Sequence, residues 1–213
     1  MQGKACYNKL LIGIKGKYKK QVFCSIIKHI VNNWQVKKLH PGENVMHYLY
    51  CPICGSKLVS KEAGDDGLVP YCEKCKKYWF DGFASCVMVL TYNQYDEIVL
   101  CRQSYLSTKY SSLTSGFITP GETAEICAVR EVKEEFGIDI QNLEYAGTYW
   151  FERGQMLMHG FMGYSPRCDF KLSVEIDSAQ WVPAKEATKT MFPDSPGNAV
   201  YGVYRKFLKK RGL

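Results

Sequence analysis

Glu131, Glu134 and Glu135 are the side chains of this sequence with the clearest capacity for chemistry. Their spacing of i, i+3 and i+4 places them at neighbouring positions on one face of a helix. Like charges so arranged repel one another, so the cluster does not stabilise a helix by itself. A hard divalent cation such as Mg²⁺ takes oxygen ligands and would resolve the repulsion. The alternative is a solvated acidic face, which is the commoner arrangement for a glutamate-rich helix.

Four cysteines form a second group suited to metal chemistry. They lie in two Cys-x-x-Cys pairs, Cys51 with Cys54 and Cys72 with Cys75, with seventeen residues between the pairs. Each pair presents two thiolates from one tight turn, and four thiolates suit tetrahedral Zn²⁺. Because such a site has no open position for a substrate water, we expect a structural zinc ribbon. A redox centre is the alternative, but two pairs without a thioredoxin-like βαβ pattern argue against it.

The glutamates require a helix that holds them on one face. Pro120 and Gly121 indicate a turn, and Thr123 precedes a run in which apolar residues recur at helical spacing. The members of this run are Ile126, Ala128, Val129, Val132 and Phe136. Gly137 then supplies a stop signal. We therefore predict a loop from Gly116, a helix that begins near Thr123, and a helix end at Gly137.

Apolar runs on both sides of this helix predict the sheet that supports it. Strands are expected over residues 84–91, 97–101, 143–151 and 155–164, with a short helix from residue 183 and a final helix over residues 198–208. Between the cysteine pairs, two short apolar runs around a glycine-bounded tip at residues 64–67 predict a hairpin. Tyr105, in the loop after the second strand of the sheet, either stacks on a nucleobase or covers an edge of the core.

The three glutamates belong to a longer pattern. In order, it reads Gly116, five residues, Glu122, seven residues, Arg130-Glu131, an apolar residue, one variable residue, Glu134-Glu135, one variable residue, Gly137 and an apolar residue. These are all the fixed positions of the Nudix box, and a chance match at every one of them is rare. The sequence therefore resembles a Nudix hydrolase, and the resemblance extends over about residues 82–212.

This resemblance implies an α/β fold, a Nudix α/β/α sandwich around a mixed sheet. It implies hydrolysis of the pyrophosphate in a nucleoside diphosphate that is linked to another group, with water as the attacking group. Mg²⁺ or Mn²⁺ would be held by a backbone carbonyl near Gly116 and by the carboxylates of Glu131, Glu134 and Glu135. Glu122 and Arg130 would pair and brace the loop against the helix, which is a structural role.

A later glutamate also matches a Nudix pattern. Glu175 lies six residues ahead of Trp181, and the resemblance implies an additional metal ligand or the general base at this position. An ordinary surface carboxylate is the alternative. Glu135 and Glu175 are therefore the candidate proton acceptors.

A four-cysteine ribbon directly ahead of a Nudix domain resembles the NADH pyrophosphatase family, over roughly residues 48–212. The resemblance implies a homodimer that cleaves NADH to nicotinamide mononucleotide and AMP and, in bacteria, removes NAD caps from RNA. That family carries a proline-rich segment after the box, whereas residues 148–156 here keep aromatic residues and have no proline. Trp150 and Phe151 are therefore candidate substrate contacts beside Tyr105. The substrate is predicted to be an NADH-like or NAD-like dinucleotide, ADP-ribose, another nucleoside diphosphate derivative or a capped RNA end.

The sequence divides into a basic segment over residues 1–45, the zinc ribbon over residues 46–81 and the Nudix domain over residues 82–213. In the basic segment nine lysines face one acidic residue, Glu43. Apolar residues at helical intervals predict an amphipathic helix over about residues 18–37. This helix either packs on the ribbon or on a second subunit, or it forms an arm that holds RNA through charge.

The bulk properties fit a nucleotide-handling protein of the cytoplasm. The formal net charge of +7 over 213 residues favours polyanionic partners. No run of about 18 apolar residues predicts a membrane span, and the N-terminus lacks a secretory signal pattern. The scattered remaining cysteines fit a reducing compartment. The competing hypothesis is a nucleotide-sensing protein that binds nucleic acid and has a non-catalytic Nudix domain, and the intact glutamates argue against it.

Overall fold

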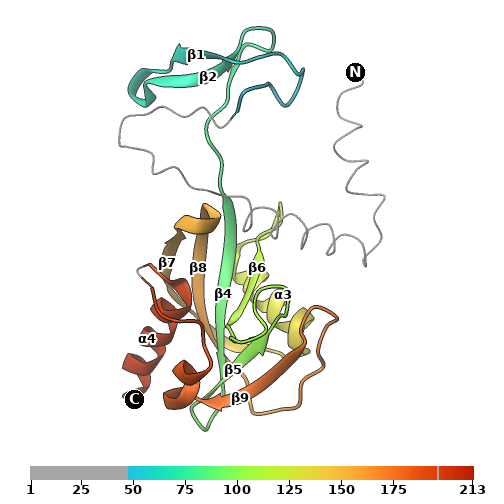
Figure 1. The fold of residues 1–213 in the computed structure, drawn as a ribbon, viewed down its shortest axis with the longest axis vertical. Helices are drawn as coiled ribbons and strands as arrows, with labels where there is room; N and C mark the ends of the chain where they lie inside the picture. The colour runs from blue at the N-terminus through green and yellow to red at the C-terminus, as the bar shows by residue number, and fades with distance from the viewer. Residues whose placement is uncertain (1–47, 196) are drawn as a thin grey trace. The chain divides into compact units, whose positions relative to one another are not determined.

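The computed structural model describes residues 48–195 and 197–213 (Figure 1). The basic segment predicted over residues 1–45, with its amphipathic helix, lies outside the described residues. The described residues form two compact units, one that ends at Gly82 and one that runs from Phe83 to Leu213. Each unit has an apolar core of its own.

The unit that ends at Gly82 is a three-stranded antiparallel sheet. Its strands, in spatial order, are β1 (Val59–Glu62), β2 (Leu68–Cys72) and β3 (Lys77–Tyr78). The hairpin between β1 and β2 turns through the 3-10 helix η1 (Gly64–Asp66), and Gly67 closes the turn at a φ of 67°, a conformation that favours glycine. The predicted hairpin is confirmed. The small core consists of Leu58 with Cys51 and Cys72, against which Tyr48 and Trp79 pack. A unit with so few buried apolar residues needs an additional source of stability.

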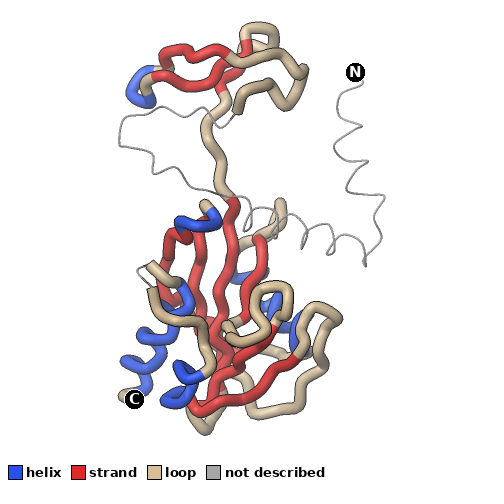
Figure 2. Tube along the Cα trace, viewed as in Figure 1, coloured by secondary structure: helices blue, strands red, loops and turns tan. Residues whose placement is uncertain are grey.

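The second unit is built on a mixed six-stranded sheet (Figures 1 and 2). The strands are β4 (Ala84–Tyr92), β5 (Glu97–Arg102), β6 (Thr114–Phe117), β7 (Gln141–Phe151), β8 (Met156–Tyr164) and β9 (Ser178–Pro183). Their hydrogen-bonded order is β7-β8-β4-β5-β9, and β6 pairs with the middle of β4. Strands β4 and β8 run parallel and the other pairs run antiparallel. The predicted mixed sheet is confirmed.

Helices cover both faces of this sheet (Figure 2). Side chains alternate along β4, so Met88 and Leu90 join a core that includes α4 (Ala199–Arg211). Val87 and Val89 join a core on the other face that includes α3 (Ala124–Phe136). The 3-10 helix η3 (Ala184–Lys189) packs on the α4 side. The architecture is the predicted α/β/α sandwich.

The helices α3 and α4 begin and end at residues that suit their free backbone groups. At the start of α3, the backbone N–H of Ile126 donates to the side chain of Thr123 at 3.3 Å, and Gly137 ends the helix in the left-handed conformation. Asn198 caps α4 by accepting from the N–H of Val200 at 3.0 Å. These local signals explain why the ends of α3 were predicted correctly, while α4 continues past residue 208 to Arg211.

One segment predicted as a loop is a strand. The sequence predicted a loop from Gly116 to the helix, but Gly116 and Phe117 belong to β6, where Gly116 lies opposite Val87 of β4. The backbone hydrogen bonds that β4 offers outweigh the weak local preference of a short segment with glycine. Gly116 is therefore fixed in the sheet, on a strand against which α3 packs.

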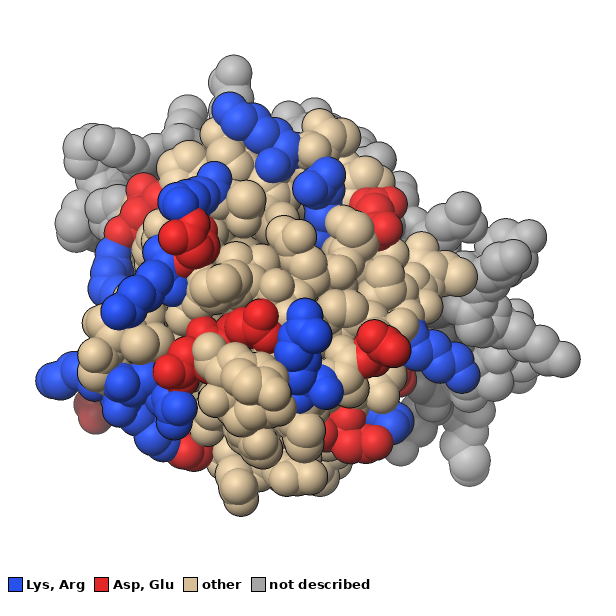
Figure 3. All heavy atoms as spheres, turned by 90° about the horizontal axis from the view of Figure 1, so that it is seen from below, with Lys and Arg blue, Asp and Glu red and all other residues tan. Residues whose placement is uncertain are grey.

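On the face drawn in Figure 3, lysine and arginine side chains are interspersed with aspartate and glutamate. Ion pairs of the second unit include Arg211 with Asp96 at 2.6 Å and Arg167 with Glu97 at 2.9 Å. The positive net charge therefore does not gather into a single patch on this face. None of the helices in residues 48–195 and 197–213 has the length and hydropathy that a membrane span requires.

Candidate metal and substrate site

Glu131, in the middle of α3, lies over strand β6. Its side chain is 13% exposed and passes so close to Gly116 that a Cβ atom there would lie 2.0 Å from Glu131 Cδ and 2.2 Å from Oε1. The backbone angles of Gly116 do not themselves demand glycine, because its φ is not positive. A side chain at this position would instead displace the Glu131 carboxylate. The Gly116 backbone and the Glu131 carboxylate are thus neighbours, as the predicted metal site requires.

Arg130 lies among the other acidic side chains of this region. Its Nε and Nη2 donate to the two carboxylate oxygens of Glu122, at 2.5 and 3.0 Å. Its Nη1 donates to Glu131 Oε1 at 2.6 Å and to Glu134 Oε2 at 3.2 Å. The bidentate pair with Glu122 fastens the loop after β6 to α3. The guanidinium also supplies positive charge between two carboxylates that repel each other.

The pair of Glu122 and Arg130 makes part of the stability depend on pH. The guanidinium, and after it the backbone N–H of Thr119, lowers the pKa of Glu122 from an ordinary 4.5 to about 2. Because the folded-state pKa is depressed, this stabilisation is present above the unfolded pKa of 4.5 and is lost as the pH falls toward 2. We expect Glu122→Gln to lower the unfolding midpoint near neutral pH and to have progressively less effect in acid. Calorimetry of both proteins over this range checks the expectation, which a pH-independent difference would contradict.

Glu135, one turn beyond Glu131, is the most deeply buried acid of the site. The exposed fraction of Glu135 is 3%. Gln103 follows β5 directly and is 7% exposed, and its Nε2 donates to Glu135 Oε1 at 3.3 Å. A buried carboxylate needs such donors. Burial and then the charge of Glu135 raise the pKa of the neighbouring Cys101 thiol. Sequence reasoning gave Gln103 no role, because no motif surrounds it and only the fold brings it to α3.

The three candidate metal-binding glutamates of α3 therefore have different surroundings. The exposed fraction of the side chain is 46% for Glu134 and 13% for Glu131, while Glu135 is buried. Glu131 and Glu134 accept hydrogen bonds from Arg130, and Glu135 accepts one from Gln103. Carboxylates on a rigid helix beside the backbone of a glycine are nevertheless the type of donor set that Mg²⁺ or Mn²⁺ prefers. Among the described residues these three side chains are not gathered closely enough to share one ion, so they would have to turn toward it.

The loop that carries Glu175 is tied to the end of α3 and to β5. The backbone N–H of Ser173 donates to the carbonyl of Glu135 at 3.0 Å, and the N–H of Asp177 donates to the carbonyl of Arg102 at 3.0 Å. Glu175 lies midway between these two anchors. Its backbone is therefore held close to the end of α3 that carries Glu135, which is compatible with the predicted role of Glu175 as a metal ligand or general base.

The three candidate substrate contacts are not equivalent. Tyr105 lies half-buried in the loop after β5, and Trp150 and Phe151 lie at the end of β7. Tyr149 packs on the α4 side of the sheet, so strand alternation directs Trp150 toward the face that carries α3 and Phe151 away from it. Trp150 thus shares a face of the sheet with the carboxylates, and Phe151 does not.

Trp150 is held in a defined orientation although its side chain is partly exposed. Its ring meets Phe83 edge to face, with 5.5 Å between the ring centroids. Its Nε1 donates to Glu152 Oε2 at 2.6 Å. An aromatic ring fixed in this way loses little freedom when a nucleobase stacks on it.

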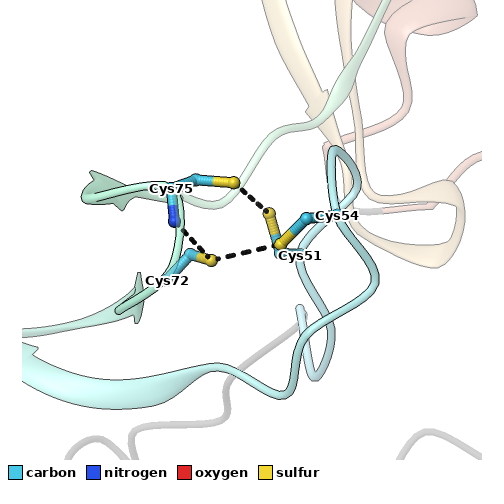
Figure 4. A group of neighbouring side chains, drawn as sticks. All are labelled: Cys51, Cys54, Cys72 and Cys75. Atoms are coloured by element: carbon cyan, nitrogen blue, oxygen red, sulfur yellow. Dashed lines mark hydrogen bonds between the residues drawn. The ribbon is translucent and has the colours of Figure 1, made fainter. Parts of the chain in front are cut away.

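The four paired cysteines converge in the smaller unit, and Figure 4 shows the two pairs facing each other. All four Sγ atoms lie within 4.8 Å of one another, with 3.5 Å between Cys54 and Cys72 and 3.9 Å between Cys51 and Cys75. Zn–S bonds of about 2.3 Å in a tetrahedron separate the sulfurs by about 3.8 Å. Among the described residues this is the one group of three or more potential ligands close enough to share an ion. The cluster therefore fits Zn²⁺.

Removing zinc should unfold the unit that ends at Gly82, because its small core contains two of the cysteines. Structural zinc contributes about 10–16 kcal/mol in small zinc modules. We expect Cys72→Ser to lose bound zinc and to open the hairpin to proteolysis, while the unit from Phe83 keeps its fold. Zinc analysis and limited proteolysis measure this, with Cys168→Ser as the control because Cys168 is exposed and outside the cluster. If the zinc-free protein resisted protease as well as the zinc-bound protein, zinc would not be what stabilises this unit.

A mixed sheet between two helical layers, with an acidic helix after a glycine-bearing strand, defines the Nudix fold class. The sequence model of the NUDIX domain matches residues 82–201, which is more than half of the 213-residue chain. The chain belongs to the Nudix domain family, as the box predicted.

Two curated relatives illustrate the similarity. The protein named NAD-capped RNA hydrolase NudC of Pseudomonas aeruginosa (strain LESB58) is 32% identical over 136 residues, which cover 63% of this chain and 48% of the relative. The protein of that name from Vibrio atlanticus (strain LGP32) is 28% identical over 149 residues, 68% of this chain and 53% of the relative. The chain thus spans about half the length of the curated relatives it matches.

Solved structures share the fold at low sequence identity. A Nudix hydrolase from Nitrosomonas europaea aligns with a TM-score of 0.63 at 17% identity, over 78% of this chain and 93% of that protein. The NUDIX domain of Shewanella oneidensis NrtR, complexed with ADP ribose, aligns with a TM-score of 0.52 at 15% identity, over 67% of this chain and 94% of that one. At these identities the likeness concerns the fold alone.

Proposed function

We propose that the protein is a metal-dependent Nudix pyrophosphohydrolase that cleaves the pyrophosphate of a nucleoside diphosphate linked to another group. The observation that carries the proposal is the contact between Glu131 and Gly116, where a glycine is kept free of a side chain so that a carboxylate can lie over the backbone. A solvated acidic face would not need this arrangement, because glutamates that serve only solubility do not restrict the residue beneath them.

In this proposal the residues of the site have three different roles. Glu131, Glu134 and Glu135, with the Gly116 carbonyl, would hold Mg²⁺ or Mn²⁺, which neutralises charge on the diphosphate and lowers the pKa of a bound water. Glu135 or Glu175 would accept the proton of the attacking water. Arg130 and Glu122 keep the loop and the helix together.

The substrate class follows from two considerations. The curated relatives are named for hydrolysis of NAD-capped RNA, and one structural neighbour holds ADP ribose. We propose an NAD-like dinucleotide, ADP-ribose or an NAD-capped RNA end, with Trp150 and Tyr105 as stacking surfaces for a base. Phe151 is the weaker candidate, because alternation turns it toward the opposite face. A structural Zn²⁺ in the ribbon, a homodimer and a cytoplasmic location complete the proposal.

A substrate panel tests the function. Purified protein is incubated with Mg²⁺ or Mn²⁺ and with NADH, NAD, ADP-ribose, nucleoside triphosphates or NAD-capped RNA, and the nucleotide products are separated by chromatography. We expect AMP from the dinucleotides and a 5′-monophosphate end from capped RNA. Salt-sensitive RNA binding without hydrolysis of any member of the panel would instead favour a nucleotide sensor that grips nucleic acid.

A further inference from the structure

Gln103 is a polar side chain outside the box that donates a hydrogen bond to the buried carboxylate of α3. Its Nε2 lies 3.3 Å from Glu135 Oε1, and both side chains are more than nine-tenths buried. The bond joins residues 32 positions apart in the sequence. Arg130 contacts Glu131 and Glu134 with a full positive charge, whereas Glu135 receives a neutral donor.

The backbone on both sides of Gln103 is fixed. The Gln103 carbonyl accepts from the N–H groups of Leu106 and Ser107, at 2.8 and 3.0 Å. The next residue, Ser104, donates to the carboxylate of Asp177 through both its backbone N–H and its hydroxyl. The Asp177 N–H in turn donates to the carbonyl of Arg102. The amide of Gln103 is therefore presented to Glu135 from a segment that is held at three points.

We propose that Gln103 is a positioning residue, whose amide holds the Glu135 carboxylate in the orientation that a divalent cation requires. The inference rests on the proposed function. A neutral donor suits this task, because it fixes one carboxylate oxygen without bringing a charge that would compete with the ion. Arginine or lysine at the same place would neutralise Glu135, and a carboxylate would repel it.

The test is metal binding by the full-length protein, with Mn²⁺ alone as the probe. Gln103→Leu keeps a side chain of similar size and removes the donor. We expect the Mn²⁺ affinity, measured from the free-ion paramagnetic resonance signal, to fall about 10- to 100-fold, the usual effect of removing a partner that orients a metal ligand. In NADH hydrolysis kcat should fall while KM for NADH stays the same. Gln180→Leu makes the same change at an exposed position on β9 and should leave the Mn²⁺ affinity and kcat unchanged.

A second arm separates positioning from a merely structural role. If Gln103 acts through Glu135, then Gln103→Leu should have no further effect on Mn²⁺ affinity in a Glu135→Gln background. An equal loss in both backgrounds, or wild-type affinity in Gln103→Leu, would overturn the inference. Should Gln103→Leu fail to fold, Gln103→Asn keeps the amide but withdraws it by one methylene, and it should weaken Mn²⁺ binding in the same direction. Absence of both Mn²⁺ binding and hydrolysis in the unmodified protein would refute the proposed function itself.

Discussion

Replacing Glu135 with glutamine is expected to lower turnover about 10³-fold while the protein stays folded. The amide has the size of the carboxylate, and its Oε1 still accepts from Gln103, so the buried position remains filled and hydrogen-bonded. What disappears is the negative charge that Glu135 would present to the proposed cation. Steady-state hydrolysis of NADH with Mg²⁺ measures the loss, and circular dichroism measures the fold.

Glu125→Gln is the matched control for this change. Glu125 lies exposed in the first turn of α3 and outside the fixed positions of the box. Its replacement should leave turnover within about twofold of the unmodified protein, since removing one exposed charge has a small effect. If Glu135→Gln kept full activity, Glu135 would be removed from the catalytic residues, and Glu175 would become the leading proton acceptor.

Gly116→Ala is expected to lower activity about 100-fold, through a change that introduces no charge and no polar group. The added methyl would lie 2.0 Å from Glu131 Cδ, well inside van der Waals contact, so the carboxylate must move. A displacement of about 1 Å in a catalytic site costs on the order of 100-fold in rate. Mn²⁺ affinity should fall with activity, because the displaced group is a proposed ligand.

The control for Gly116→Ala is the same substitution where space is available. At Gly82 an added Cβ would meet the Tyr48 hydroxyl at 3.6 Å, an ordinary contact, and the φ of Gly82 is not positive. Gly82→Ala should therefore keep both Mn²⁺ affinity and turnover. Normal Mn²⁺ binding by Gly116→Ala would show that the contact between Gly116 and Glu131 is packing without function, and it would remove the main support for the proposed metal site.

The parts of the fold that local chemistry determines were predictable from the sequence. Thr123 and Gly137 define the ends of α3, because a side-chain cap and a left-handed glycine act within one helical turn. The spacing of the glutamates on that helix and the two cysteine pairs are likewise local. The long apolar runs of β4 and β8 identified buried strands for the same reason.

The parts that depend on distant partners were not predictable. Strand β6 is short, contains glycine and exists because β4 offers it hydrogen bonds. Gln103 acquires a role only when the end of β5 meets the last turn of α3. Two of the residues at helical spacing, Ile126 and Val129, are 55% and 40% exposed, because the sheet contacts a narrower stripe of α3 than the apolar pattern spans.

The close contact under Glu131 also restricts the order in which this site can change during evolution. A side chain at residue 116 displaces the carboxylate as long as residue 131 keeps the length of glutamate, so a substitution of the glycine is costly for as long as the position of that carboxylate matters. In a lineage that still hydrolyses its substrate, a substitution of the glycine would be tolerated only after residue 131 had become shorter and another residue had taken over its role. Descendants with alanine or serine at position 116 should therefore carry a shorter residue at position 131.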